Sequence, residues 1–327
     1  MSNTPLVSVI TPTLNQARFI RHTLQSVRDQ RYAEVEHIVV DGGSSDETLE
    51  ILKMQRQQPR FRWTSEPDAG MYDAVNKGLR MARGEILAYL NSDDFYLPWT
   101  IQAAVDYLQA HPEVDLVYGD YMSIDEASGN WLLLLQPPYT RGYIRRTGFI
   151  PQPTVFWRRA LYERLGEFDA TLQYVGDCDY WMRAGAVSTI GKLDEVLAVD
   201  RIQQDAKRSR EPAPLVAELE LVRRRHSRGG DRGRGPLDRA YAAFWRRLQL
   251  IRLLAVIERT GPRPERWSGL LSEYVVRPDP LPVILSLLPV LGVRYLAAAL
   301  HVLPRRTQRR AVVSANGTLP GGADDPP

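Results

Sequence analysis

Short β-branched runs and amphipathic segments alternate along the first part of the chain, and this alternation restricts the fold more than any other feature. The β-branched runs at 6–10 and 35–40 are separated by apolar residues at helical spacing, such as Phe19, Leu24 and Val27. Further strands are expected at 61–64, 85–90 and 115–118, and helices at 49–54, 72–82 and 101–110. Such alternation is typical of a mainly parallel sheet covered on both faces. The sequence therefore predicts an α/β fold.

The pattern becomes less regular after Gly129, because prolines at 137–138, 151 and 153 limit regular structure. Short helices are still expected at 156–165 and 179–184. The single cysteine, Cys178, excludes an internal disulfide framework and a cysteine-based zinc site, which suits a reducing compartment. The first residues lack a basic segment followed by an apolar one, so no secretory signal is expected.

Charge divides the chain into two parts. Residues 1–204 hold 20 Lys and Arg against 27 Asp and Glu, a net charge of −7, whereas residues 205–327 hold 22 against 12, a net charge of +10. This asymmetry indicates two parts with different partners. We expect an α/β domain over 1–204, a basic helix and linker over 205–236, a helical region over 237–313 and a disordered tail over 314–327.

The apolar segment 281–303 raises the question of a membrane. It is long enough for one span, since about 20 apolar residues suffice. Pro282, Pro289 and Arg294 instead favour helices that lie at the membrane interface or pack together. A soluble helical cap or a dimer interface is the alternative.

Two adjacent carboxylates follow the strand expected at 85–90, in the segment Asn91-Ser92-Asp93-Asp94. Ligands of open α/β sheets bind at the carboxyl ends of the strands. Neighbouring carboxylates repel each other unless they share a cation or a proton, and oxygen ligands of this kind suit Mg²⁺ or Mn²⁺. The same residues could instead begin a turn and cap the following helix. The tetrapeptide alone leaves both interpretations open.

Polar loops also follow the first three strands, at 11–15, 41–46 and 66–78. Their glycines let the backbone approach a ligand, and Asp41 can accept a hydrogen bond from an N–H donor such as a pyrimidine edge. A turn with an N-cap at Ser45 or Asp46 explains the second loop on its own. Four such loops at one edge of a sheet are more typical of a ligand site.

In order and spacing these segments resemble the family 2 glycosyltransferases, which have the GT-A nucleotide-sugar-binding fold, across residues 5–204. The residues that carry the resemblance are Val7–Asn15, Val40–Thr48, Ser65–Gly70, Tyr72–Gly78 and Leu90–Phe95. The Glu-Pro-Asp-x-Gly and Asn-Ser-Asp-Asp variants are most similar to the subgroup that builds bacterial surface polysaccharides. The resemblance implies a GT-A, Rossmann-like domain followed by a C-terminal α-helical extension.

The resemblance also implies a nucleotide-sugar site built from the strand-end loops. Its expected residues are Thr11, Pro12, Asn15, Asp41, Gly43, Asp68, Asn76, Lys77, Asn91 and Ser92. Among these, Thr11 and Pro12 would line the nucleotide site and Asp41 would contact the base. Asp68 and the 76–78 segment would lie beneath the nucleotide and sugar.

Asn91-Ser92-Asp93 stands at the place of the family's Asp-x-Asp motif. The resemblance implies that Asp93, helped by Asp94, binds Mn²⁺ or Mg²⁺ at the diphosphate, with Asn91 near the ribose. Because Asn91 adds no negative charge, metal affinity depends more on Asp93. Val75 stands where many relatives have an arginine near the diphosphate. Positive charge would then come from Lys77, from an arginine elsewhere or from the metal.

Downstream, Gly176-Asp177-Cys178-Asp179 resembles the family's Glu-Asp-x-Asp segment. Asp177 would be the catalytic base, and Gly176 replaces the glutamate. Asp179 is expected to have a structural role at a helix start, which the helix dipole favours. Gln152 would lie on the acceptor side, and Cys178 is expected to be a packed side chain rather than a nucleophile.

The resemblance thus implies inverting transfer of a sugar from a nucleotide-diphosphate donor to a glycan or lipid-linked acceptor in surface polysaccharide or lipopolysaccharide biosynthesis. The expected location is cytoplasmic, peripheral on the inner face of the membrane, where the basic part meets anionic lipid. The alternative is a non-catalytic glycosyltransferase-like subunit of a membrane-bound assembly complex. Residues 11–16 lack the Gly-x-Gly-x-x-Gly of dinucleotide enzymes, and the arginine-rich linker lacks the interleaved aromatics expected for nucleic-acid binding.

Overall fold

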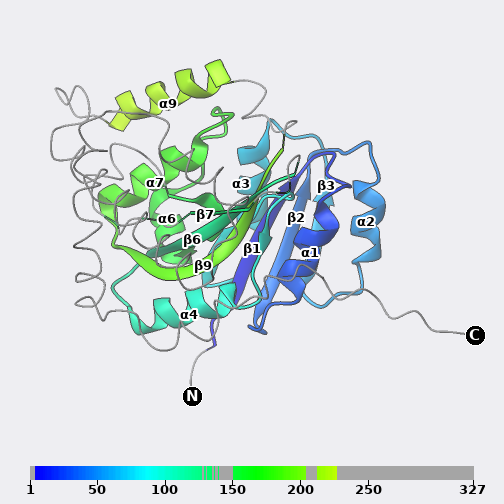
Figure 1. Ribbon diagram of the computed structural model, residues 1–327, viewed down its shortest axis with the longest axis horizontal. Coiled ribbons are helices and arrows are strands. Elements are labelled where there is room, and N and C mark those ends of the chain that lie inside the picture. The colour runs from blue at the N-terminus through cyan, green and yellow to red at the C-terminus, as the bar shows by residue number, and fades with distance from the viewer. Residues whose placement is uncertain are drawn as a thin grey trace, which may run out of the picture. The chain divides into compact units, whose positions relative to one another are not determined.

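The computed structural model describes residues 4–126, 129, 131–134, 136, 139, 150–203 and 212–226 (Figure 1). Contacts divide the chain into two compact units, 1–242 and 243–327, and every described residue belongs to the first. The expected regions 237–313 and 314–327, and with them the apolar segment 281–303, lie outside the described residues. Within the described ranges, no helix is long and apolar enough to cross a membrane.

The described residues form one nine-stranded sheet with the order β3-β2-β1-β4-β8-β6-β9-β5, in which β7 pairs with β6. The strands are β1 Val7–Thr13, β2 Val35–Asp41, β3 Phe61–Ser65, β4 Ile86–Tyr89, β5 Phe95–Tyr96, β6 Leu116–Asp125, β7 Trp131–Leu134, β8 Phe156–Arg158 and β9 Ile190–Ile202. The four strands β3, β2, β1 and β4 are parallel, whereas β8 is antiparallel to both of its neighbours. The predicted α/β fold with a mainly parallel sheet is confirmed.

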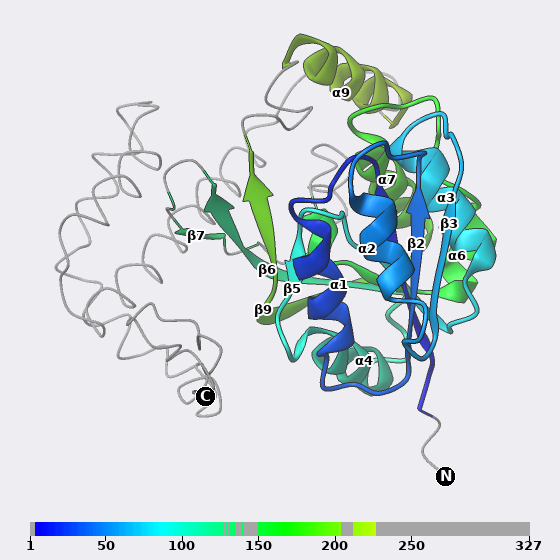
Figure 2. The same cartoon turned by 90° about the vertical axis from the view of Figure 1, so that its right-hand side faces the viewer.

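Helices cover both faces of the sheet (Figure 2). They are α1 Ile20–Arg28, α2 Thr48–Met54, α3 Met71–Met81, α4 Thr100–Ala110, α6 Arg159–Leu165, α7 Gly176–Val187 and α9 Pro212–His226, with a 3₁₀ turn, η1, at Gln152–Thr154. Alternate residues of a strand face opposite sides. Ile10 accordingly packs in one core with α3, α6 and α7, whereas Val9 packs in another with α1 and α4.

One expected element is wrong in part. The segment 156–165 was expected to be a helix throughout, but Phe156–Arg158 is strand β8 and only Arg159–Leu165 is helical. The short strand lies between β4 and β6, where both Phe156 and Trp157 are fully buried, one in each core. Pairing with two strands therefore overrides the local preference.

Strand β1 extends beyond the expected end at Ile10 to Thr13, and it includes a proline. Its pairing with β4 ends at Ile10, whereas its pairing with β2 continues to Thr13. Pro12 therefore occupies a stretch that has a neighbouring strand on one side only, which is where a strand tolerates a residue without an N–H donor. The extension carries Thr11 and Thr13 to the edge at which the loops gather.

Candidate active site

The loops after β1, β2 and β3 meet at the carboxyl edge of the parallel strands. Gly42 N–H donates to the Thr13 carbonyl (2.9 Å), and Glu66 N–H donates to the Asp41 carbonyl (3.0 Å). Asn15, with φ of +53°, accepts a hydrogen bond from Ser45 N–H through its Oδ1 (2.8 Å). These contacts bring together the segments that the sequence predicted to form one site.

Asp41 is fully buried, and its carboxylate holds the shape of its own loop. Oδ2 accepts hydrogen bonds from Gly43 N–H (3.0 Å), Ser44 N–H (2.9 Å) and the Ser65 hydroxyl (2.7 Å), while the Ser44 hydroxyl donates to Oδ1. Gly43 adopts φ of +89°, a conformation that favours glycine. The structure thus gives Asp41 an organising role, and its contact with a base stays a prediction.

Asp68 lies directly against the second loop. A Cβ atom at Gly42 would lie only 2.5 Å from Asp68 Oδ2, so the absence of a side chain at this position allows the two loops to approach. Asp68 Oδ1 accepts from Gly70 N–H (2.9 Å). Burial raises the pKa of Asp68, and the nearby Asp73 and Asp41 charges act in the same direction. Asp68 is therefore a carboxylate at the loop edge that can accept a donor from a ligand.

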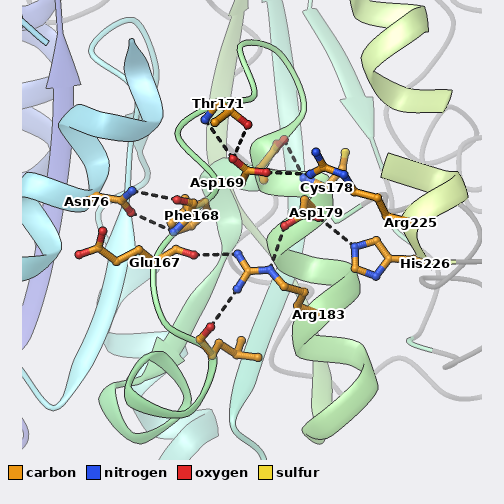
Figure 3. A network of polar contacts seen from close by, with 12 residues as sticks. Asn76, Glu167, Phe168, Asp169, Thr171, Cys178, Asp179, Arg183, Arg225 and His226 are labelled. Carbon is orange, nitrogen blue, oxygen red and sulfur yellow. Dashed lines mark hydrogen bonds and ion pairs between the residues drawn. The ribbon is translucent and has the colours of Figure 1, made fainter. Parts of the chain in front are cut away.

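Some predicted site residues are used inside the protein. Thr11 is buried in β1, and its hydroxyl is hydrogen-bonded to His37 Nε2 (2.9 Å). Asn76 Nδ2 donates to the Phe168 carbonyl (2.9 Å), and its Oδ1 accepts from Phe168 N–H (2.9 Å), as Figure 3 shows. Asn76 therefore attaches α3 to the segment that leads to α7. Thr13 is not among the residues expected to form the site, yet its hydroxyl is buried and has no hydrogen-bond partner among the described residues.

Positive charge near the site does not come from position 75, because Val75 is fully buried in the core. Lys77 Nζ lies 3.1 Å from Glu66 and 3.4 Å from Asp73, so two carboxylates already balance its charge. An arginine from another element is close to the site. Arg201, near the end of β9, donates its backbone N–H to Asp94 Oδ1 (3.1 Å) and ion-pairs with Glu126.

The Asn91–Asp94 segment presents oxygen atoms suited to a hard cation. Asn91 Nδ2 donates to Gln152 Oε1 (3.1 Å), and its Oδ1 is buried without a partner among the described residues. Asp93 Oδ2 accepts from Gln203 Nε2 (2.8 Å). In the described part of the chain no group of three or more His, Cys, Asp or Glu side chains could hold a metal. The side-chain oxygens of Asp93 and Asn91 are of the type that Mg²⁺ or Mn²⁺ binds when one or two protein oxygens act together with substrate phosphates.

Asp94 and Ser92 fix the shape of this segment. Asp94 is almost fully buried and bonds the backbone of Arg201. The Thr23 hydroxyl of α1 donates to the carbonyls of Ser92 (2.8 Å) and Asp94 (2.7 Å). Gln152, which is also buried, donates to the Tyr89 carbonyl (2.6 Å). The structure thus places these polar groups around Asn91 and Asp93 as supports.

Asp177 lies in the first turn of α7 and is half-buried. Its Oδ1 accepts hydrogen bonds from the Tyr72 hydroxyl (3.1 Å) and from Cys178 N–H (2.8 Å). Burial raises the pKa of Asp177, and these hydrogen bonds offset only part of that effect. A carboxylate has about four lone-pair sites, so Asp177 retains the capacity to take a proton. These are the properties of a general base.

The neighbours of Asp177 explain two features of its motif. A Cβ atom at Gly176 would lie 2.7 Å from the Tyr72 ring. The ring of Tyr72 therefore occupies the space that a side chain at position 176, which is glutamate in the family's pattern, would need. Burial and the Asp177 charge raise the pKa of the Cys178 thiol, which therefore stays protonated. This agrees with a packed rather than a nucleophilic cysteine.

Tyr89 connects the two ends of the site. Burial raises its pKa well above the ordinary value, and the charges of Asp177 and Asp94 add to the effect. The hydroxyl of Tyr89 is buried without a partner among the described residues. Tyr89, at the end of β4, therefore lies within electrostatic range of both Asp177 and Asp94. Neither Tyr72 nor Tyr89 is among the residues expected from the sequence to form the site, although Tyr72 stands inside the Tyr72–Gly78 motif.

A mainly parallel sheet with polar loops along one edge, an oxygen-rich turn after β4 and a half-buried carboxylate at the start of α7 is the arrangement of a GT-A fold. The family model for glycosyl transferase family 2 matches residues 8–166. An uncharacterized glycosyltransferase of Mycobacterium tuberculosis is 34% identical over 191 residues, covering 57% of this chain and 71% of the relative. The chain belongs to glycosyltransferase family 2 and is a glycosyltransferase.

A second relative has a named pathway. The PGL/p-HBAD biosynthesis glycosyltransferase of Mycobacterium bovis is 32% identical over 182 residues, which are 55% of this chain and 69% of that protein.

Two solved structures share the fold. TarS 1-349 of S. aureus in complex with UDP-GlcNAc has a TM-score of 0.56 at 22% identity, covering 66% of this chain and 65% of that chain. The mannosyltransferase PcManGT from Pyrobaculum calidifontis, in complex with GDP-Man and Mn²⁺, has a TM-score of 0.51 at 20% identity, covering 94% and 79%. At these identities the likeness establishes the fold alone, and the predicted GT-A fold is confirmed.

Proposed function

We propose that this glycosyltransferase moves a sugar, with inversion at the anomeric carbon, from a nucleoside-diphosphate donor to a hydroxyl of a glycan or lipid-linked acceptor. The observation that carries the proposal is Asp177, a half-buried carboxylate with a raised pKa in the first turn of α7. Tyr72 orients it through one oxygen. A base with these properties suits deprotonation of a sugar hydroxyl.

The reaction would proceed in one displacement. The acceptor oxygen attacks the anomeric carbon from the face opposite the diphosphate and forms the new C–O bond. The bond between the anomeric carbon and the diphosphate oxygen breaks, and the nucleoside diphosphate leaves with that electron pair. Asp177 takes the proton from the acceptor hydroxyl. Its raised pKa makes the carboxylate a stronger base than an ordinary aspartate.

Asp93 and the amide oxygen of Asn91 are the residues that would hold Mn²⁺ or Mg²⁺. When bound, such a cation neutralises charge that develops on the leaving diphosphate. Asp68 and the loop held by Asp41 would bind the nucleoside. The complexes of TarS with UDP-GlcNAc and of the Pyrobaculum enzyme with GDP-Man and Mn²⁺ support a nucleotide-sugar donor and a divalent metal.

The acceptor proposal depends on two further observations. The relative named for PGL/p-HBAD biosynthesis supports a glycoconjugate acceptor. The net charge of +10 over residues 205–327 favours contact with an anionic membrane surface, where a lipid-linked acceptor would lie. Both fit a peripheral enzyme on the inner face of the cytoplasmic membrane that contributes to a surface polysaccharide or lipopolysaccharide.

A screen of nucleotide sugars tests the function. The full-length protein is incubated with each donor and Mn²⁺, with and without a chelator, and release of nucleoside diphosphate and formation of product are measured. Asp177→Asn should lower turnover by about 10²- to 10⁴-fold while donor binding survives. Asp106→Asn, on the exposed side of α4, is the matched control. Wild-type turnover by Asp177→Asn would show that the base has been assigned wrongly.

A further inference from the structure

Helix α9 packs directly against the region that presents Asp177, as both ribbon views show (Figures 1 and 2). Val222 of α9 is fully buried and forms an apolar cluster with Leu172, Val175 and Met182. Leu215 and Leu219 pack at the edge of the same cluster. Residues spaced by three and four share one face of a helix. One face of α9 is therefore fixed to the start of α7.

Glu218 lies within this docked part of α9 and binds the backbone that leads into α7. Its carboxylate accepts hydrogen bonds from the N–H groups of Gln173 (2.7 Å), Tyr174 (2.6 Å) and Val175 (3.0 Å). Hydrogen bonds to an ionised acceptor are roughly twice as strong as neutral ones. A negative charge is also favourable at the N-terminus of a helix. Glu218 therefore fixes the three residues that end immediately before α7.

The segment 173–175 contacts both sides of the site. The Tyr174 carbonyl accepts a hydrogen bond (3.4 Å) from the same Tyr72 hydroxyl that binds Asp177. On the donor side, Gln173 Nε2 donates to the Ala69 carbonyl (3.3 Å). The backbone that Glu218 holds thus joins the loop after β3 to the proposed base.

Two further contacts attach α9 without reaching this segment. Arg225 lies 2.7 Å from Asp169, and His226 Nε2 lies 2.9 Å from Asp179, as Figure 3 shows. Asp179 also pairs with Arg183. Helix α9 is therefore attached by contacts that do not involve residues 173–175, in addition to the hydrogen bonds that Glu218 makes with those residues.

We infer that Glu218 is a positioning residue for Asp177, acting through residues 173–175 to fix the carboxylate that takes the acceptor proton. The inference rests on the proposed function of Asp177. It makes the first helix of the basic C-terminal part a component of the catalytic centre. Glu218 lies beyond residues 8–166, which the family model matches.

The test replaces Glu218 in the full chain. Glu218→Gln puts an amide group against backbone N–H donors and removes the charge. Because small misplacements of catalytic groups can cost up to about 100-fold, kcat should fall by about 10- to 100-fold. The donor KM should change by less than about twofold, since Glu218 binds the backbone of Gln173, whereas the contact with the loop after β3 is made by the Gln173 side chain. Glu220→Gln, which makes the same charge change at an exposed ion pair with Arg224, should keep the wild-type kcat.

Two comparisons separate positioning from general docking. Arg225→Gln loosens α9 without touching residues 173–175, so it should lower the melting temperature but not kcat. In an Asp177→Asn background, Glu218→Gln should cause no further loss, because both changes act through one carboxylate. The inference would be overturned if Arg225→Gln and Glu218→Gln lowered kcat equally. It would also be overturned if Glu218→Gln lowered kcat in the Asp177→Asn variant by the same factor as in the wild type.

A folding failure and a failure of the proposed function can each be recognised. If Glu218→Gln does not fold, Glu218→Asp is used instead, because it keeps the charge on a shorter side chain. It should show the same selective loss of kcat. A folded Glu218→Asp with wild-type kcat contradicts the inference. If Asp177→Asn itself turns over at the wild-type rate, the proposed function fails, whatever Glu218 does.

Discussion

At the scale of single residues, some polar groups of the site are available to a ligand, whereas others form hydrogen bonds that stabilise the surrounding loops. Asp41 is saturated by donors of its own neighbourhood, and Asp94 binds the backbone of β9. Asp177 accepts hydrogen bonds on Oδ1 from the Tyr72 hydroxyl and from Cys178 N–H. Burial raises the pKa of Asp177, and these hydrogen bonds only partly compensate. Because of this raised pKa, the carboxylate accepts a proton more readily than an ordinary aspartate does.

Tyr72→Phe tests the hold on this base. The hydroxyl of Tyr72 stabilises the charged form of Asp177, so its removal should raise the pKa of Asp177 further. Activity is lost as pH falls through that pKa, so the acidic limb of the kcat/KM profile should move to higher pH. Loss of one hydrogen bond should also lower kcat by roughly fivefold to thirtyfold.

The control for this experiment is Tyr32→Phe, which loses a hydrogen bond to the Pro5 carbonyl far from the loops. Both variants keep the aromatic ring and therefore the packing. The idea fails if the two pH profiles coincide, or if the Tyr72→Phe limb moves toward lower pH.

At the scale of elements, the turn after β4 presents the Asp93 carboxylate and the Asn91 amide oxygen, whereas Asp94 accepts a hydrogen bond from the backbone of Arg201. Asp93→Asn should weaken Mn²⁺-dependent binding of the nucleoside diphosphate by more than about tenfold, since Asp93 is the main charged ligand proposed for the metal. Titration calorimetry with and without Mn²⁺ measures the effect. Asp106→Asn should bind like the wild type, and equal affinity of Asp93→Asn with and without the metal would contradict a metal role.

The sequence predicted the elements that follow periodic patterns, and it located the loops that lie between them. Strands β1, β2 and β4 could be predicted because parallel pairing buries both faces and leaves near-continuous apolar runs. Strand β8 could not, because Phe156 and Trp157 also suit a helix and only pairing with β4 and β6 decides between the two. Local patterns carry no information on such long-range pairing.

The same limit applies to the site. Motif order selected Asp93 and Asp177 as candidates, but it could not show that Asn76 binds Phe168 or that Val75 is buried in the core. Glu218 is separated from Asp177 by 41 positions in the printed numbering, and no spacing rule connects them. Supporting contacts of this kind depend on how elements pack rather than on how residues are ordered.

At the scale of the whole described unit, an aromatic cluster on one face of the sheet supports the base. The ring of Phe168 stacks on Tyr180 with a centroid distance of 4.0 Å and meets Trp181 edge-on at 6.0 Å. Tyr72 and Tyr89 lie in the same core. Aromatic rings bury large areas in defined geometries. The carboxylate of Asp177 is hydrogen-bonded to Tyr72, one of the rings of this core.

Part of the pH dependence of this unit's stability should come from one histidine. His37 of β2 lies between the Thr11 hydroxyl and the ring of Phe61, and burial lowers its pKa to about 3. The unfolded chain takes up a proton near the ordinary pKa of 6.5, whereas the folded protein does not. Stability is therefore present above pH 6.5 and falls as pH decreases toward 3, by up to about 1.4 kcal/mol per pH unit.

Urea unfolding at pH 7, 6 and 5, followed by fluorescence of the buried Trp157 and Trp181, measures this slope. His37→Gln should flatten it, whereas His111→Gln, at an exposed position after α4, should not. Carboxylates with lowered pKa, such as Asp179, lose their contribution only as pH falls through more acidic values, so they do not act in this range. His22, whose pKa burial lowers while it stays partly exposed, should contribute less than His37. A slope that survives in His37→Gln would place the pH-sensitive group elsewhere in the chain.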